Sequence, residues 1–204
     1  MVIPKIKFVW SYIYQEEIHG TSLINYDRTK SKNYVEIFLD KIKEEWNERK
    51  EQILLEMASC CGLNWPEITI PCYVIEQSIH GPISEPLTIP IQLQDDGELY
   101  ELSPTRFVDM LTHELIHVLF IQHDKVDQYF DYIVKKYTAL SENAAAHIIV
   151  HAIHKHIFLT VFNQERLDEE IEASSWYPDY KAAWDIVEEQ DYKVIIDEFK
   201  QKVQ

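Results

Sequence analysis

The spacing of apolar and polar residues predicts strands in the first half of the chain. Large side chains recur at every second position from Ile6 to Tyr14, which is the period of a β-strand. Residues 25–32 are polar and are expected to form a loop. Apolar residues then recur at helical spacing from Val35 to Met57, and Gly62 can end this long helix in the left-handed conformation.

Two further strands are expected at Ile68–Ile75 and Leu87–Leu93. Each contains a proline, Pro71 or Pro90, which lacks the N–H that a strand paired on both sides needs. At least one of these strands should therefore lie at a sheet edge or a bulge. Residues 96–97 are Asp-Gly and predict a turn, after which residues 98–102 can form a short returning strand.

The second half of the chain has the periodicity of helices. Ser103 can cap a helix and Pro104 suits its first position, so a helix is expected from about Pro104 to about Gln122. The remaining helices are expected at residues 125–137, 142–162, 165–173, 179–189 and about 191–203.

The helix after Pro104 contains the pentapeptide His113-Glu114-Leu115-Ile116-His117. Residues four apart lie on one face of a helix, so both imidazoles can reach one metal ion. Glu114 can then hold a water bound to that metal. Two histidines and this glutamate are the minimal set of a zinc hydrolase.

The surroundings of the motif favour a functional reading over chance. No charged residue occupies positions 110–112, 115–116 or 118–120, as expected for a helix beneath a cleft. Asp109, one turn before His113, can orient that imidazole as a hydrogen-bond acceptor, or it can be a solvated surface carboxylate. The alternative for the whole motif is a buried structural helix whose histidines bond to their neighbours.

The motif and the order of the elements around it resemble the zincin metallopeptidases. The resemblance is specific over about fifteen residues around His113 and architectural elsewhere. It implies an α+β fold in which a small N-terminal mixed sheet and a long helix pack on the active-site helix, followed by a helical C-terminal half. We expect a single zincin-like domain over residues 1–204, with a strand-containing part at 1–102 and a helical part at 103–204.

The third metal ligand decides the subclass of zincin, and several residues compete for it. His123 has the spacing of metzincins, but their turn needs a glycine where this chain has Phe120, and no methionine follows. Glu142 has the chain distance of a gluzincin ligand, although a carboxylate at a helix start is also favoured by the helix dipole alone. His147 is preferred, with Glu142 and then His151 as alternatives.

His147 belongs to a stripe with His151 and His154 along one face of an almost wholly apolar helix. Buried imidazoles need partners, and a metal with the groups around it would supply them. Core histidines bonded to backbone or carboxylates are the alternative. His151 or His154 could also stabilise the oxyanion of the reaction or support a ligand, as could a tyrosine of the segment at residues 177–180.

Composition narrows the partners and the location. A net charge of −16 argues against nucleic acid or an anionic membrane as the main partner. The sequence has no run of 18 apolar residues, so no transmembrane helix is expected. The N-terminus does not resemble a signal peptide. The cysteines at 60, 61 and 72 fit reduced, buried thiols, so a cytoplasmic location is expected.

Together these patterns predict a zinc-dependent hydrolase. The specific expectation is a metallopeptidase of narrow specificity that cleaves a peptide or protein substrate with a zinc-bound water and Glu114 as general base. The alternative is a catalytically inactive zincin-fold protein that binds metal or protein partners. No substrate and no oligomeric state follow from the sequence.

Overall fold

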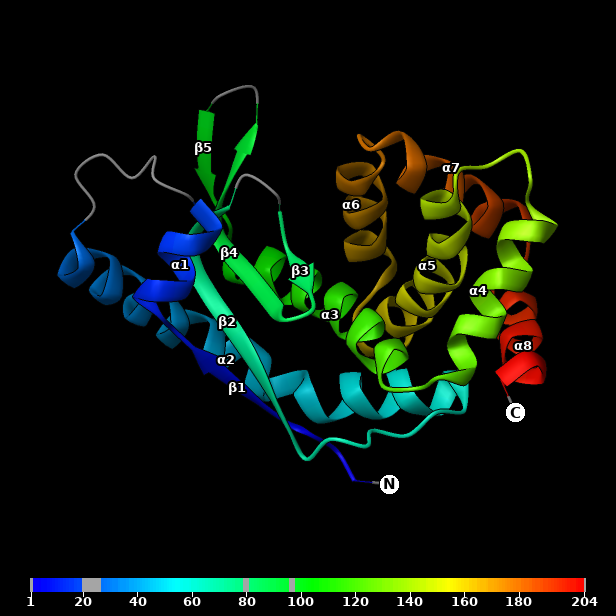
Figure 1. Ribbon diagram of the computed structural model, residues 1–204, viewed down its shortest axis with the longest axis horizontal. Helices are drawn as coiled ribbons and strands as arrows, with labels where there is room; N and C mark the ends of the chain where they lie inside the picture. The colour runs from blue at the N-terminus through cyan, green and yellow to red at the C-terminus, as the bar shows by residue number, and fades with distance from the viewer. Residues whose placement is uncertain (1, 20–26, 79–80, 96–97, 204) are drawn as a thin grey trace. The chain divides into compact units, whose positions relative to one another are not determined.

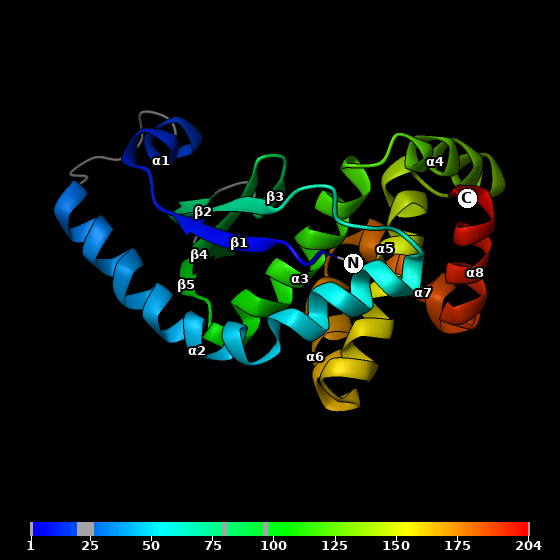
Figure 2. The ribbon, with the colours of Figure 1, turned by 90° about the horizontal axis from the view of Figure 1, so that it is seen from below.

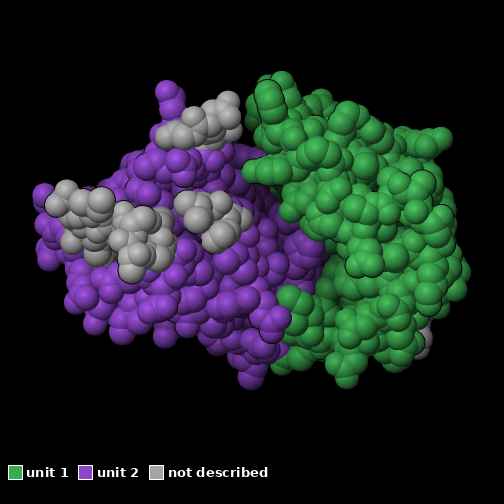
Figure 3. All heavy atoms as spheres, turned by 45° about the horizontal axis from the view of Figure 1, so that its top comes forward, with its two compact units in different colours: residues 1–3, 51–66, 119–204 green, residues 4–50, 67–118 purple. Residues whose placement is uncertain are grey.

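The computed structural model describes residues 2–19, 27–78, 81–95 and 98–203 (Figure 1). The chain divides into two compact units, drawn in two colours in Figure 3. The strand-containing unit comprises residues 4–50 and 67–118, and the helical unit comprises residues 1–3, 51–66 and 119–204. The turn expected at residues 96–97 lies outside the described residues.

The strand-containing unit is built on a mixed sheet. Strands β1 (Lys5–Val9), β2 (Thr69–Ser78) and β4 (Leu87–Asp95) are parallel neighbours in that order. Strands β3 (Ile83–Ser84) and β5 (Glu98–Glu101) both pair antiparallel with β4. The small mixed sheet and the returning strand predicted from the sequence are confirmed.

Both strand prolines occupy positions where one side of the ladder is open. Pro71 pairs with Lys7 of β1, whereas the pairing of β2 with β4 begins only at Tyr73. Pro90 pairs with Ile75 of β2, and on its other side β3 pairs with residues 87–88 and β5 with residues 92–95. Within the described residues each proline thus has a ladder partner in one strand only, as its missing N–H requires.

Two long helices, α2 (Arg28–Cys61) and α3 (Pro104–Ile121), begin in this unit and continue into the other. The ring of Phe107 in α3 contacts Phe8 of β1 at 6.2 Å and Phe38 of α2 at 5.7 Å between centroids. These edge-to-face contacts pack both helices on the sheet face to which Phe8 points. Figure 2 shows the two helices on the same side of the strands.

Local capping defines the ends of these helices. Ser103 Oγ accepts a hydrogen bond from the backbone N–H of Arg106 at 3.1 Å, so the predicted start of α3 is confirmed. Gly62 has a φ of 71° and follows the last residue of α2, as predicted. The predicted loop at Asn25–Lys32 is wrong from Arg28 onward, because Asp27 accepts hydrogen bonds from two backbone N–H groups and starts α2 there.

The predicted first strand is wrong beyond Val9. Residues Tyr12–His19 form helix α1, which begins where Ser11 Oγ accepts a hydrogen bond from the N–H of Tyr14. The Tyr14 ring packs 4.6 Å from that of Tyr73 in β2, and its hydroxyl lies 2.7 Å from Thr88 Oγ1 in β4. Large side chains at every second position suggested a strand here. The contacts of Tyr14 instead belong to a helix that packs against the sheet.

The helical unit is organised around α5 (Glu142–Val161). Most of its residues are buried, and it packs against α4 (Lys125–Lys136), α6 (Gln164–Ser174), α7 (Pro178–Glu189) and α8 (Tyr192–Val203). These helices match the sequence expectations to within a residue or two. By length and composition α5 could also cross a membrane, but 72% of its apolar window is buried inside the structure.

The fold of the described residues is therefore mixed α+β, mostly helical with a small mixed sheet. Cys60, Cys61 and Cys72 are free and buried, as expected for reduced thiols. For Cys72, burial and the nearby Glu114 raise the thiol pKa.

Candidate metal centre

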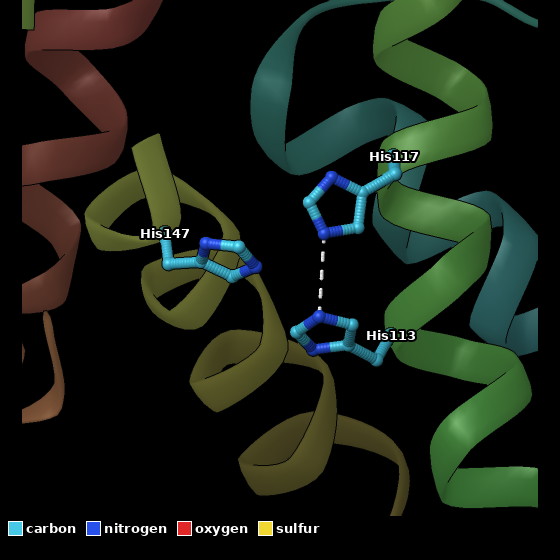
Figure 4. A group of neighbouring side chains, drawn as sticks. All are labelled: His113, His117 and His147. Carbon is cyan, nitrogen blue, oxygen red and sulfur yellow. Dashed lines mark hydrogen bonds between the residues drawn. The ribbon is translucent and has the colours of Figure 1, made fainter. Parts of the chain in front are cut away.

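The motif helix α3 presents its two histidines and its glutamate as the 3.6-residue period predicts. His113 and Glu114 are buried, at 7% and 5% exposure, and His117 is partly exposed. The rings of His113 and His117 lie one turn apart and face each other, with 5.1 Å between their centroids (Figure 4).

The distance between these two imidazoles suits a shared metal ion. Nε2 of His113 and Nε2 of His117 are 3.3 Å apart. Two ligand nitrogens at about 2.0–2.1 Å from a tetrahedral zinc ion would be separated by roughly 3.3–3.4 Å. The alternative is a hydrogen bond between the rings, in which one nitrogen donates and the other accepts. The 3.3 Å separation of the two nitrogens thus fits a shared zinc ion as well as a hydrogen bond between the rings.

Glu114 is fixed beside the pair by a residue far away in the sequence. Ser84 Oγ, in the short strand β3, donates a 2.7 Å hydrogen bond to Glu114 Oε2. Burial raises the pKa of the Glu114 carboxyl to about 7, and the Ser84 hydrogen bond opposes that rise. The carboxyl is therefore held in one orientation, with a proton affinity close to that of an imidazole.

His147, on α5 in the helical unit, has its own set of contacts. Its Nδ1 lies 2.8 Å from the backbone oxygen of Asn143, and its ring centroid is 4.4 Å from that of Tyr180 in α7. Burial lowers the pKa of His147, which favours the neutral imidazole that a metal ligand must be.

His113, His117 and His147 form a group that could hold a metal ion. Figure 4 draws the three side chains. Three imidazole nitrogens are a donor set that suits zinc and leaves one tetrahedral position for a water or a substrate. The donor chemistry fits the metal that the sequence predicts.

The other ligand candidates lie apart from this group or have different contacts. Glu142 is exposed in the first turn of α5, next to the capping residue Ser141. His123 follows the end of α3, and its Nε2 lies 2.7 Å from the backbone oxygen of Asn64. His151 stacks on Trp184 at 4.2 Å with an interplanar angle of 12°.

Asp109 and His154, which the sequence suggested as supporting residues of the metal site, are both buried. Asp109 is 4% exposed, so the reading as a solvated surface carboxylate is wrong, while its role beside His113 stays a prediction. His154 is fully buried against Phe158 and Trp184. The tyrosine segment at residues 177–180 is not a loop over a cleft, because α7 starts within it and Tyr180 packs on His147 from that helix.

The sequence reasoning missed Ser84, and it assigned no role to Asn143. Ser84 contacts Glu114 across 30 residues and carries no motif that could reveal it. Asn143 had a visible signal, because it stands four residues before His147, where a helical carbonyl lies within reach of a histidine Nδ1. No family model, curated protein or solved structure matches this chain.

Proposed function

We propose that this protein is a metal-dependent hydrolase, with zinc held by His113, His117 and His147 and with Glu114 as general base. The observation that carries the proposal is the 3.3 Å separation of the His113 and His117 Nε2 atoms next to a buried carboxyl. His147 would supply the third imidazole. By its resemblance to the zincins, the chain would act on amide bonds of a peptide or protein substrate.

Each residue has a distinct part in this proposal. A bound zinc ion would supply Lewis-acid chemistry to the reaction. The three imidazoles are neutral donors, so the site keeps a net positive charge once it is loaded and attracts a carbonyl oxygen or a developing oxyanion. Glu114, next in the chain to His113 and held by Ser84, would take a proton from the attacking water and pass it to the leaving amine.

The test combines metal content with hydrolysis. We expect the full-length protein, purified without chelator, to contain about one zinc ion per chain by elemental analysis. Glu114→Gln should keep the zinc and lose on the order of 100-fold or more in the cleavage of a fluorogenic peptide library. Glu142→Gln is the matched control, because this exposed carboxyl lies outside the proposed site, and it should change neither quantity.

Two results would contradict the proposal in different ways. A protein that takes up no zinc, even when reconstituted with the ion, would remove the metal centre altogether. A protein that binds zinc but shows the same peptide cleavage, or none, with and without the Glu114 carboxyl would favour the non-catalytic metal-binding alternative.

A further inference from the structure

Asp179, in the first turn of α7, joins that helix to the beginning of α5. Its Oδ1 accepts a hydrogen bond from Ser141 Oγ at 2.7 Å, and its Oδ2 accepts one from Asn143 Nδ2 at 2.9 Å. These two hydrogen bonds lower the pKa of Asp179, so the carboxylate is ionised at neutral pH. Both oxygens of the Asp179 carboxylate thus accept hydrogen bonds from residues at the beginning of α5.

The same turn of α5 determines which nitrogen of His147 can bind a metal. The backbone oxygen of Asn143, 2.8 Å from His147 Nδ1, can only accept, so Nδ1 carries the proton in the neutral ring. The lone pair then lies on Nε2. Asn143 therefore contacts Asp179 through its side chain and His147 through its main chain.

A second contact from α7 restricts the His147 ring. Tyr180, the residue after Asp179, packs against the imidazole with 4.4 Å between centroids and an interplanar angle of 34°. One helical turn thus both anchors the N-terminus of α5 and supports the ring face of His147. Groups that orient a metal-binding imidazole in this way increase metal affinity, because less freedom is lost when the ligand binds.

We propose that Asp179 is a positioning residue of the metal site, which acts through Asn143 to hold His147 ready for the ion. The inference rests on the proposed function, since it needs His147 to be a ligand. It adds to that function a residue with no contact to the metal. Asp179 is partly exposed and its two hydrogen bonds lie at the surface, so they contribute little to the stability of the fold, and its main effect is on the orientation of His147.

The experiment measures zinc affinity of the full-length protein by competition with a chromophoric chelator. Asp179→Ala and Asn143→Ala should each weaken zinc binding about 10-fold. The double variant should be no weaker than Asp179→Ala, because that change already removes the hydrogen bond between Asp179 and Asn143. Asp185→Ala is the matched control, since Asp185 is an exposed carboxylate of the same helix that pairs with Lys181, and it should leave the affinity unchanged.

Thermal melting in excess chelator separates positioning from folding. The metal-free variants should melt cooperatively within a few degrees of the wild type; if Asp179→Ala does not, Asn143→Ala with its intact backbone carbonyl carries the test. Unchanged affinity in Asp179→Ala and Asn143→Ala, or fully additive losses in the double variant, would overturn the inference and leave the proposed function standing. A wild-type protein without zinc affinity would overturn both.

Discussion

The hydroxyl of Ser84 donates a 2.7 Å hydrogen bond to Oε2 of Glu114, and this bond connects a two-residue strand to the motif helix. Glu114 is 5% exposed, so Ser84 replaces a hydrogen bond that water would make in the unfolded chain. An ionised carboxylate left without such a donor inside the protein is unfavourable.

Ser84→Ala should therefore destabilise the strand-containing unit. The expected loss in the free energy of unfolding is about 1–3 kcal/mol, the range for a buried acceptor that loses its donor. Urea denaturation of the chelator-treated protein measures it. Ser59→Ala is the control, because Ser59 is exposed and donates only to a backbone oxygen of its own helix. An equal loss of unfolding free energy in both variants would contradict this prediction, because the Ser84 hydrogen bond would then stabilise the protein no more than that of Ser59.

The ion pair between Lys136 of α4 and Glu198 of α8 predicts a pH-dependent contribution to stability. Burial alone would raise the pKa of Glu198, but hydrogen bonds from Lys136 and Tyr132 outweigh it and hold the pKa below its usual value. A carboxyl whose pKa is lowered by folding stabilises the protein above its ordinary pKa, and this contribution is lost as the pH falls through the lowered value.

Glu198→Gln should therefore reduce the free energy of unfolding at pH 7 by about 0.5–1 kcal/mol. The difference from wild type should shrink as the pH is lowered to about 3, where the wild-type carboxyl takes up its proton. Chemical denaturation across this pH range measures both. Asp197→Asn is the control, because Asp197 is an exposed neighbour 3.9 Å from Lys200, and it should change the free energy of unfolding at pH 7 by less than about 0.5 kcal/mol. A difference that stays constant with pH would contradict the charged pairing.

The stacking of His151 on Trp184 predicts that this tryptophan is a main support of the helical unit. Trp184 is 1% exposed and its Nε1 donates a 2.8 Å hydrogen bond to Ser174 Oγ. Trp184→Phe should lower the free energy of unfolding by about 2–3 kcal/mol, since it removes buried volume and leaves Ser174 without this partner. The same change at Trp176, which is 86% exposed, should stay within about 0.5 kcal/mol.

Helix positions were predictable because their determinants are local. Ser103 and Pro104 marked the start of α3, and Gly62 the end of α2, through capping rules that involve only neighbours in the chain. The same rules were available but overlooked at Ser11 and Asp27, where α1 and α2 begin. The alternation from Ile6 to Tyr14 indicated a strand, but the contacts of Tyr14 with Tyr73 and Thr88 determine the structure there.

The sequence predicts only those residues of the candidate site that lie together on one helix. His113, Glu114 and His117 follow from the period of α3 alone. The choice among Glu142, His147 and His151 depends on which side of α5 is buried, and an almost wholly apolar helix gives no such signal. The structure exposes Glu142 and stacks His151 on Trp184, which leaves His147 as the proposed third ligand.

The last prediction concerns the metal ligands themselves. His113→Ala or His117→Ala should abolish zinc binding, and His147→Ala should weaken it by at least about 100-fold, because each removes one of three nitrogen donors. Glu142→Ala should leave it unchanged, since that carboxylate is exposed. Equilibrium dialysis with radioactive zinc, at a fixed pH, compares the four variants. Stoichiometric zinc in His113→Ala would refute the motif assignment. A larger loss in Glu142→Ala than in His147→Ala would make the glutamate the third ligand, as in gluzincins.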